Sequence, residues 1–196
     1  MKKLSTFHTI MASIESATDA TEKMFKDLGI TEYAFIGGLA TIFHGYPRTT
    51  HDVDVIIRAN DFDKIYEDMD RLTSYGFNIG AEGELWHKDG TKVELLVEES
   101  RFFKSPDQIV PFLSDIPRSN DKRFPDLITH FKLKSTSGRS QDIADIVNLI
   151  KNLSIEEEAL KSILNNLDSK QKENFKRALS DLKKEDERYL NLNIEG

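Results

Sequence analysis

Apolar residues recur along this chain in two periods, one typical of helices and one typical of strands. Between residues 5 and 28 they are spaced mostly by three and four, which predicts an amphipathic helix. Short apolar runs at 32–37 and 51–58 predict strands, and residues 38–45 between them predict a two-turn helix. The N-terminal part of the chain therefore alternates helix and strand, as α/β proteins do.

The next segment predicts a helix, a hairpin and then loops. Asn60 is expected to cap a helix from Asp61 to about Tyr75. An Asp-Gly pair within residues 84–98 lies between two strand-like runs and predicts a β-hairpin. Residues 101–124 are interrupted by prolines, so we expect loops with short strand pieces there.

Helical periodicity returns after Pro125, which is expected in the first turn of a helix. Ser154 and Glu157 have the spacing of a capping box, which predicts that a new helix begins at Ser154. The last helix is strongly charged and has only a thin apolar stripe, typical of a docking helix or a loosely held tail. The predicted helices span 126–136, 140–152, 154–165 and 169–190.

The length of 196 residues suits one sizeable domain or a core with a small appendage. We expect an α/β core over residues 1–122 and a helical region over 123–196. The absence of cysteine excludes disulfides, thiol catalysis and zinc–thiolate sites. The N-terminus lacks the apolar segment of a secretory signal, and no apolar run reaches the roughly 18 residues of a membrane span. A cytoplasmic protein without membrane contact is therefore expected.

The formal net charge of −7 means that the surface as a whole does not attract nucleic acid. A nucleic-acid substrate would need a local basic strip. The candidates for such a strip are Lys122, Arg123, Lys132, Lys134 and Arg139. The same residues are equally consistent with a solvated helix face.

Candidate chemistry is concentrated between the first two predicted strands. Asp52 and Asp54 are two residues apart on a strand, so their carboxylates project from the same face. Two adjacent carboxylates favour a cation between them, and hard oxygen ligands favour Mg²⁺ or Mn²⁺. Gly37 and Gly38 allow close approach of backbone to a ligand, and the following helix offers N–H groups to phosphate. The pattern predicts a site for a metal-bound polyphosphate, although a plain strand–helix turn also explains the glycines.

The sequence GG-x-A at Gly37–Ala40, followed by HG-x-P-R-x-T-x-D-V-D at His44–Asp54, resembles the nucleotidyltransferase superfamily, whose core is shared with DNA polymerase β. Within it, the chain is most similar to small bacterial nucleotidyltransferase-like proteins of the abortive-infection and toxin–antitoxin type. The resemblance is close over residues 33–58 and looser to about Lys151. It implies a small mixed sheet with helices on one side, followed by a helical C-terminal half.

The resemblance also implies an activity, namely Mg²⁺-dependent transfer of a nucleoside monophosphate from an NTP to a hydroxyl, with release of pyrophosphate. Asp52 and Asp54 would be catalytic metal ligands. Arg48 and Thr50 match the family's R-x-T pattern and would bind the nucleotide, Arg48 through phosphate oxygens. A surface arginine after a proline turn is the alternative for Arg48.

Glu94 occupies the place where the resemblance puts a third catalytic and metal-binding acid, usually Asp. A solvent-facing strand glutamate is the alternative, and Glu98 and Glu99 compete for the role. In the C-terminal half, Lys132 and Arg139 match a K…R…D-x-x-D segment that would contact the nucleotide. An ordinary surface ion-pair cluster of Arg139 with Asp142 and Asp145 explains that segment almost as well.

The expected partners are an NTP and a hydroxyl acceptor, which is the end of a transfer RNA, a protein side chain or a small molecule such as an antibiotic. A cognate antitoxin and a second copy of the chain are further candidate partners. Two other functions remain open: a catalytically degenerate nucleotide-binding or toxin–antitoxin partner protein, and a phosphohydrolase that uses Asp-x-Asp differently.

Overall fold

The computed structural model describes residues 2–102 and 105–192, and side chains over 8–102 and 108–192. Residues 193–196, the end of the predicted helical region, lie outside this part. The chain divides into two compact units. One combines the chain up to Ala40 with Arg48–Pro125, and the other combines Thr41–Pro47 with the chain from Asp126 onward. We expected a single boundary between residues 122 and 123. In the structure the first unit runs to Pro125, and the segment Thr41–Pro47 belongs to the helical unit.

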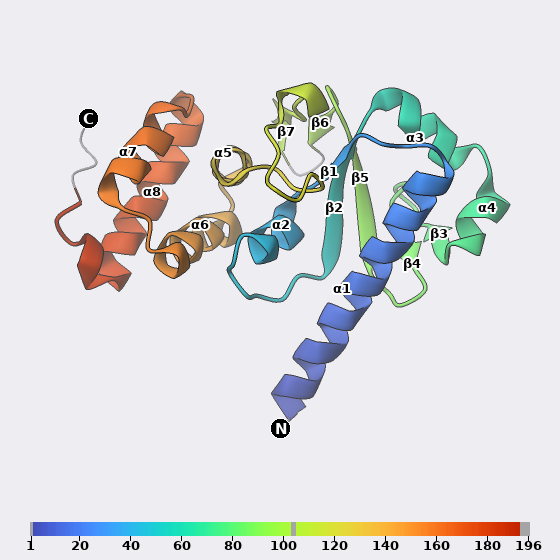
Figure 1. Cartoon of the computed structure of the whole chain (residues 1–196), viewed down its shortest axis with the longest axis horizontal. Helices are drawn as coiled ribbons and strands as arrows, with labels where there is room; N and C mark the ends of the chain where they lie inside the picture. The colour runs from blue at the N-terminus through green and yellow to red at the C-terminus, as the bar shows by residue number, and fades with distance from the viewer. Residues whose placement is uncertain (1, 103–104, 193–196) are drawn as a thin grey trace. The chain divides into compact units, whose positions relative to one another are not determined.

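The first unit is built on a mixed β-sheet, which in the described part of the chain has five strands (Figure 1). Strands β2 and β5 are parallel, and the other neighbouring pairs are antiparallel. The order across the sheet is β1 (Tyr33–Phe35), β2 (Asp52–Ile57), β5 (Lys92–Val97), β4 (Leu85–His87) and β3 (Phe77–Ile79). The α/β class expected from the sequence is confirmed, and so is the hairpin, formed by β4 and β5.

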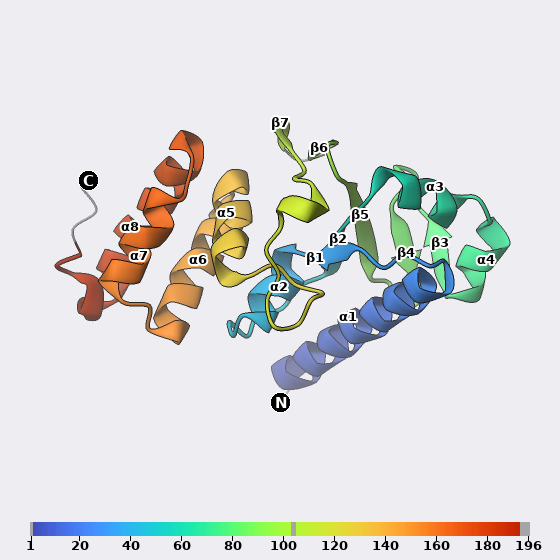
Figure 2. The same ribbon diagram turned by 45° about the horizontal axis from the view of Figure 1, so that its top comes forward.

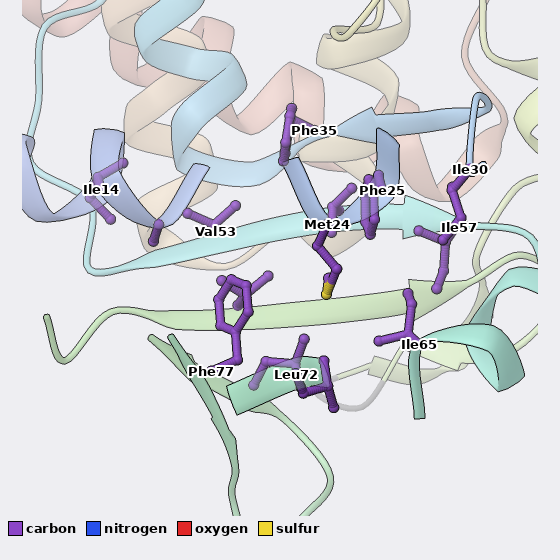
Figure 3. Close-up of a cluster of buried hydrophobic side chains, with 14 of the residues drawn as sticks. Ile14, Met24, Phe25, Ile30, Phe35, Val53, Ile57, Ile65, Leu72 and Phe77 are labelled. Carbon is purple, nitrogen blue, oxygen red and sulfur yellow. The ribbon is translucent and has the colours of Figure 1, made fainter. Parts of the chain in front are cut away.

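The apolar core of this unit receives side chains from α1 (Lys2–Asp27), α3 (Ala59–Tyr66) and α4 (Met69–Ser74), and also Ala40 from the helix at Gly37–Phe43. Figure 3 shows Met24 and Phe25 of α1 beside Ile57 of β2. Val53 and Val55 of β2 belong to the same buried cluster. Because side chains alternate along a strand, the even-numbered residues of β2 face the opposite side of the sheet.

The single helix expected from Asp61 to Tyr75 is wrong, because two short helices occupy this segment. Asp68 separates them: its carboxylate accepts a hydrogen bond from the Arg71 N–H at 3.0 Å and caps α4. The side-chain acceptor competes with the continuing helix for backbone donors. Asn60 is not the cap of α3, since Arg58 precedes that helix and makes no side-chain cap bond.

Helix α2 (Gly37–Phe43) follows β1 directly, so Gly37 is helical where the prediction ended a strand. Beyond β5, the expected short strand pieces are β6 (Arg101–Phe102) and β7 (Ser105–Ile109), which form a separate two-stranded ribbon (Figure 2). A single 3₁₀ turn, η1 (Leu113–Asp115), lies in the loop that follows.

The second unit consists mainly of helices α5 (Leu127–Ser137), α6 (Ser140–Leu153), α7 (Glu157–Asn165) and α8 (Ser169–Glu185), with a 3₁₀ turn η2 (Glu187–Tyr189). Helix α8 packs against α5 and α6. Its apolar stripe, Phe175, Ala178, Leu179 and Leu182, is buried in the core of this unit. The charged last helix is therefore a structural part of the unit and not a loosely held tail.

The helix starts in this unit differ from the prediction. Ser154 does not begin a helix: it ends α6 in the left-handed conformation, with φ of 50°. Helix α7 begins after Glu156, without a side-chain cap bond. The chain does contain a capping box, but it is formed by Asp168 and Gln171 at the start of α8.

Pro125 lies before the cap of α5 and not in its first turn. The cap is Asp126, whose carboxylate accepts from the Thr129 N–H at 2.7 Å. Of the helices that the structure describes, none combines the length and apolar character needed to cross a membrane.

Candidate functional site

The parallel pairing of β2 with β5 places four charged side chains together. In its register Asp52 is opposite Lys92, and Asp54 is opposite Glu94. Paired residues and residues two apart share a face of a sheet, so all four project from the face that is opposite to Val53 and Val93. We call Asp52, Asp54, Lys92 and Glu94 the strand cluster. Both predicted aspartates and the predicted third acid belong to it.

Glu94 is the glutamate that the fold brings to the aspartates. Glu98 follows the end of β5, and its carboxylate accepts a hydrogen bond from the Leu113 N–H at 3.0 Å. Glu99 is exposed and has a left-handed backbone, with φ of 63°. Both competitors lie beyond the strand, whereas Glu94 lies directly opposite Asp54.

Lys92 is the member of the strand cluster that sequence reasoning missed. Its ammonium lies 2.8 Å from Oε2 of Glu94, and the two side chains are only 24% and 18% exposed. Burial alone would lower the pKa of Lys92, but the hydrogen bond to Glu94 and the charges of the three carboxylates raise it above its usual value. The signal in the sequence was its position two residues before Glu94, on the same face of the strand.

Gly37 is held against one of the aspartates. It has φ of 63°, a left-handed conformation that favours glycine. A β-carbon at this position would lie 3.0 Å from Cγ of Asp54 and closer still to its carboxylate oxygen Oδ2. The missing side chain therefore makes room for Asp54 as well as permitting the turn.

Gly38 likewise leaves room for Arg48 and Thr50, the two residues of the predicted R-x-T pattern. A β-carbon there would lie 2.7 Å from Nη2 of Arg48 and 2.8 Å from Cβ of Thr50. Thr50 is buried, and its hydroxyl donates to Oδ1 of Asp52 at 3.1 Å. Arg48 also donates from Nη1 to the Thr49 carbonyl at 2.7 Å. The glycine pair, the arginine, the threonine and the aspartates thus form one continuous site.

The chemistry of these donors fits a hard divalent cation, because three carboxylates lie at neighbouring positions on one face of the sheet. Among the described residues, however, no three carboxylate or histidine side chains are already arranged to hold a metal ion. In this arrangement Glu94 accepts a hydrogen bond from Lys92, and Asp52 accepts one from Thr50. Asp52 and Asp54 would hold the cation, and Glu94 would join them after leaving Lys92.

The second unit contains the other predicted residues. Lys132 is half-buried on α5, and Arg139 is the exposed residue before α6. Arg139 donates from Nε to Oδ2 of Asp142 at 2.7 Å. Asp142 and Asp145 are 1% and 0% exposed, so the interpretation of this segment as a surface ion-pair cluster is wrong for both aspartates. A role of Lys132 and Arg139 in nucleotide binding stays a prediction.

Lys134 neutralises the buried aspartates. Its ammonium lies 2.7 Å from Asp142 and 2.6 Å from Asp145, and its side chain is 5% exposed. We call Lys134, Arg139, Asp142 and Asp145 the helical ion cluster. Lys134 lies three residues after the buried Phe131, on the same helix face, and this spacing was the signal that sequence reasoning overlooked.

Hydrogen bonds connect the helical ion cluster to its surroundings. Ser137 donates to Asp142 at 2.6 Å, and Gln141 donates to Asp145 at 3.1 Å. The hydroxyl of Thr41, from the α2 end that belongs to this unit, lies 3.0 Å from Nε2 of His130. Buried charged groups require hydrogen-bond and ion-pair partners, because an unpaired buried charge lowers the stability of the fold.

Most of the five cations considered for a basic strip are engaged in ion pairs. Lys134 is buried in the helical ion cluster. Arg123 pairs with Asp121 at 2.6 Å and with Glu22 at 2.9 Å. Arg139 pairs with Asp142 at 2.7 Å, so three of the five candidate cations are paired with carboxylates within their own units.

Compared with known proteins, the chain matches no protein-family model and no curated protein sequence. The site is therefore interpreted from its own geometry and from the resemblance of residues 33–58.

We expect Gly37→Ala to reduce the free energy of unfolding by more than the same change at Gly29. Both glycines have a left-handed backbone, with φ of 63° and 70°, so alanine costs about 1–2 kcal/mol of backbone strain at either. Only at Gly37 would the methyl group also collide with Asp54, which adds about 1–3 kcal/mol. Urea denaturation of both variants measures the difference, and equal losses would show that the Asp54 contact is unimportant.

Lys134→Met should destabilise the second unit by about 3–5 kcal/mol, because two buried carboxylates lose their shared cation. Lys132→Met is the matched control, since it removes the same charge from the same helix at a half-buried position. Thermal and urea unfolding of both variants measures the effect. Similar stability of the two variants would contradict the role assigned to Lys134.

The helical ion cluster also predicts a pH dependence. Burial alone would raise the pKa of Asp142, but the Lys134 ammonium and hydrogen bonds from Arg139, Lys134 and Ser137 outweigh it and lower the pKa to about 2. A lowered pKa stabilises the fold above the unfolded-state value near 4. About 2 kcal/mol should therefore be lost as the pH falls from about 4 to 2.

Asp142→Asn removes the titrating carboxyl and isolates this contribution. The variant should be less stable than the native chain at pH 7, and its stability should change less between pH 4 and pH 2. Unfolding free energies measured across this pH range test the expectation. Parallel pH profiles for the two proteins would count against it.

Proposed function

We propose that this chain transfers a nucleoside monophosphate from an NTP to a hydroxyl acceptor and releases pyrophosphate, in a reaction that depends on Mg²⁺ or Mn²⁺. The observation that carries the proposal is the in-register pairing of Asp54 with Glu94, beside Asp52 and the glycine turn. The same residues carry the sequence resemblance to nucleotidyltransferases. The mixed sheet with Asp-x-Asp on one strand is consistent with a nucleotidyltransferase-like core.

The strand cluster supplies the cation-binding part of this proposal. Asp52 and Asp54 project from one strand, and Glu94 projects from the strand beside it. When bound, the divalent cation neutralises charge on the triphosphate and on the leaving pyrophosphate. Thr50 fixes the orientation of Asp52 through its hydroxyl, and Gly37 leaves room for Asp54. These contacts hold the two metal-binding carboxylates before the substrate arrives.

The glycine turn and Arg48 supply the phosphate-binding part. The guanidinium of Arg48 lies over the Cα of Gly38, so its donors and the adjacent backbone meet at one place. A guanidinium pairs with phosphate oxygens through two parallel hydrogen bonds. We therefore assign Arg48 to the triphosphate, with Gly38 leaving the room in which its guanidinium lies beside the turn.

In the reaction, the acceptor hydroxyl attacks the α-phosphorus of the NTP, and the bond from that phosphorus to the bridging oxygen breaks. The proton of the hydroxyl passes to a carboxylate, for which Glu94 is the candidate once it has left Lys92. Pyrophosphate leaves with the bond electrons. The net result is one new phosphodiester that joins the nucleoside to the acceptor.

One observation favours a second candidate function, a catalytically degenerate nucleotide-binding protein that acts as a partner in a toxin–antitoxin pair. The third acid is engaged by Lys92 at 2.8 Å, so the three carboxylates are not all available to a cation. Such a protein would bind an NTP with Mg²⁺ and release no pyrophosphate. An Asp-x-Asp phosphohydrolase would instead release orthophosphate.

We expect Asp52→Asn and Asp54→Asn to reduce pyrophosphate release by about 10³-fold, because the cation they hold contributes several kcal/mol of charge stabilisation. The assay supplies each α-labelled NTP with Mg²⁺ and cell extract, and follows label into RNA, protein or small molecules. Folding should be preserved in both variants, since each removes one of two mutually repelling charges.

Asp63→Asn is the matched control, because Asp63 is exposed on α3, away from the site. This variant should behave like the native chain. Near-native transfer by Asp52→Asn or Asp54→Asn would reject the proposed site. NTP binding without product in the native chain would favour the degenerate alternative, and orthophosphate release would favour the hydrolase.

A further inference from the structure

Lys92 is a partly buried lysine that lies among the carboxylates of the strand cluster. It is opposite Asp52 across the β2–β5 ladder and two residues from Glu94 on its own strand. The ladder thus surrounds one ammonium with three carboxylates on a single face. Lys92 is three-quarters buried, and its nitrogen lies 2.8 Å from Glu94. Exposed ion pairs contribute little to stability, whereas the charges of partly buried ones are screened less by salt.

The charges of the strand cluster indicate how many cations it accommodates. Three carboxylates carry three negative charges, and Lys92 returns one positive charge. Two negative charges remain, which a single divalent cation neutralises. Without Lys92, the unbalanced charge would favour a second divalent ion near Glu94, because like charges this close require an opposite charge between them.

We propose that Lys92 is a built-in cation that takes the place of one metal ion, so that the site binds a single divalent cation at Asp52 and Asp54 while Lys92 holds Glu94. This inference rests on the proposed function, because it concerns the same cation site. It goes beyond that function by stating that Lys92 sets the number of divalent cations that the site binds. A second ion binds at Glu94 only when the ammonium has been displaced.

The arrangement also gives Lys92 a regulatory effect on Glu94. While the ion pair is closed, Glu94 accepts a hydrogen bond from Lys92 and is not available to a cation. An event that draws Lys92 away, such as binding of a triphosphate with its own negative charge, would release Glu94 for proton transfer. Lys92 would then act as a positioning residue that couples substrate binding to the third acid.

The experiment is a Mn²⁺ titration of the full chain without nucleotide, followed by the electron paramagnetic resonance of free Mn²⁺ and by calorimetry. We expect one Mn²⁺ per native chain. Lys92→Met should bind two ions, or bind the first about 10-fold more tightly, because about 1.4 kcal/mol of cation competition is removed. Adding Glu94→Gln to Lys92→Met should return the stoichiometry to one, which would place the second ion at Glu94.

Two variants serve as controls. Lys92→Arg keeps the charge and should bind Mn²⁺ like the native chain. Lys88→Met removes the same charge from the exposed turn of the same hairpin, and it should also leave Mn²⁺ binding unchanged. Lys92→Gln repeats the test with a polar side chain, and circular dichroism verifies that each variant is folded.

The outcomes separate this inference from the proposed function. Two Mn²⁺ ions on the native chain, or unchanged binding in both Lys92→Met and Lys92→Gln, would overturn the role of Lys92 and leave the metal site in place. No Mn²⁺ binding by the native chain or by either Lys92 variant would overturn both. One ion on the native chain and a stronger or second site in the Lys92 variants would support the inference.

Discussion

The parallel ladder between β2 and β5 is the interaction on which the first unit depends. It is the parallel pair in an otherwise antiparallel five-stranded sheet within the described residues. Its register places Val53 beside Val93 on the buried face and Asp54 beside Glu94 on the other. A slip of one residue would exchange the two faces of β5 and bring Glu94 into the apolar core. The hydrophobic core therefore holds the charged site in register, because a slip would bury Glu94 in that core.

The glycine turn adds a second constraint. Gly37 and Gly38 are adjacent, and each leaves space for side chains that come from further along the chain: Asp54 at the first, Arg48 and Thr50 at the second. The turn thus connects the end of β1 with the start of β2 through side-chain contacts as well as through the chain itself. Side chains that are already confined by such contacts lose less conformational entropy when a ligand binds.

Sequence patterns predicted β1, β2, the β4–β5 hairpin and most helices of this chain, since burial on one face leaves a clear pattern, but β3, which is only three residues long, was not predicted. Strand spacing and the glycine pair selected Asp52, Asp54, Gly37 and Gly38, because these are local properties. The resemblance to nucleotidyltransferases, and not periodicity, selected Arg48, Thr50 and Glu94. Sequence patterns failed where a side chain changed the path of the backbone, as at Asp68, and where a cap pattern coincided with a helix end, as at Ser154, which ends α6 while α7 begins after Glu156.

Sequence reasoning did not select Lys92, and it considered Lys134 only for a basic strip, because a lysine is usually exposed. Lys134 is buried with carboxylates from another helix, and the position of Lys92 opposite Asp52 exists only after β2 and β5 have paired. Lys92 pairs on its own strand but faces Asp52 across the ladder. Lys134 meets Asp142 and Asp145 from a different helix. Tertiary pairing of charges is the part that periodicity does not contain.

The short segment Thr41–Pro47 has a consequence for how the chain is assembled during synthesis. It belongs to the helical unit, where Tyr46 packs against the buried core and the Gly45 carbonyl accepts a hydrogen bond from Asn152 at 3.2 Å. The ribosome makes this segment long before the helices that surround it. The helical unit therefore completes its core only after α8 has been synthesised. Before α5 has been made, Thr41–Pro47 has none of its helical partners, although most of the sheet has already been made. A nascent chain stalled before α5 would carry Tyr46 without its partners, a form that chaperones would recognise as incomplete.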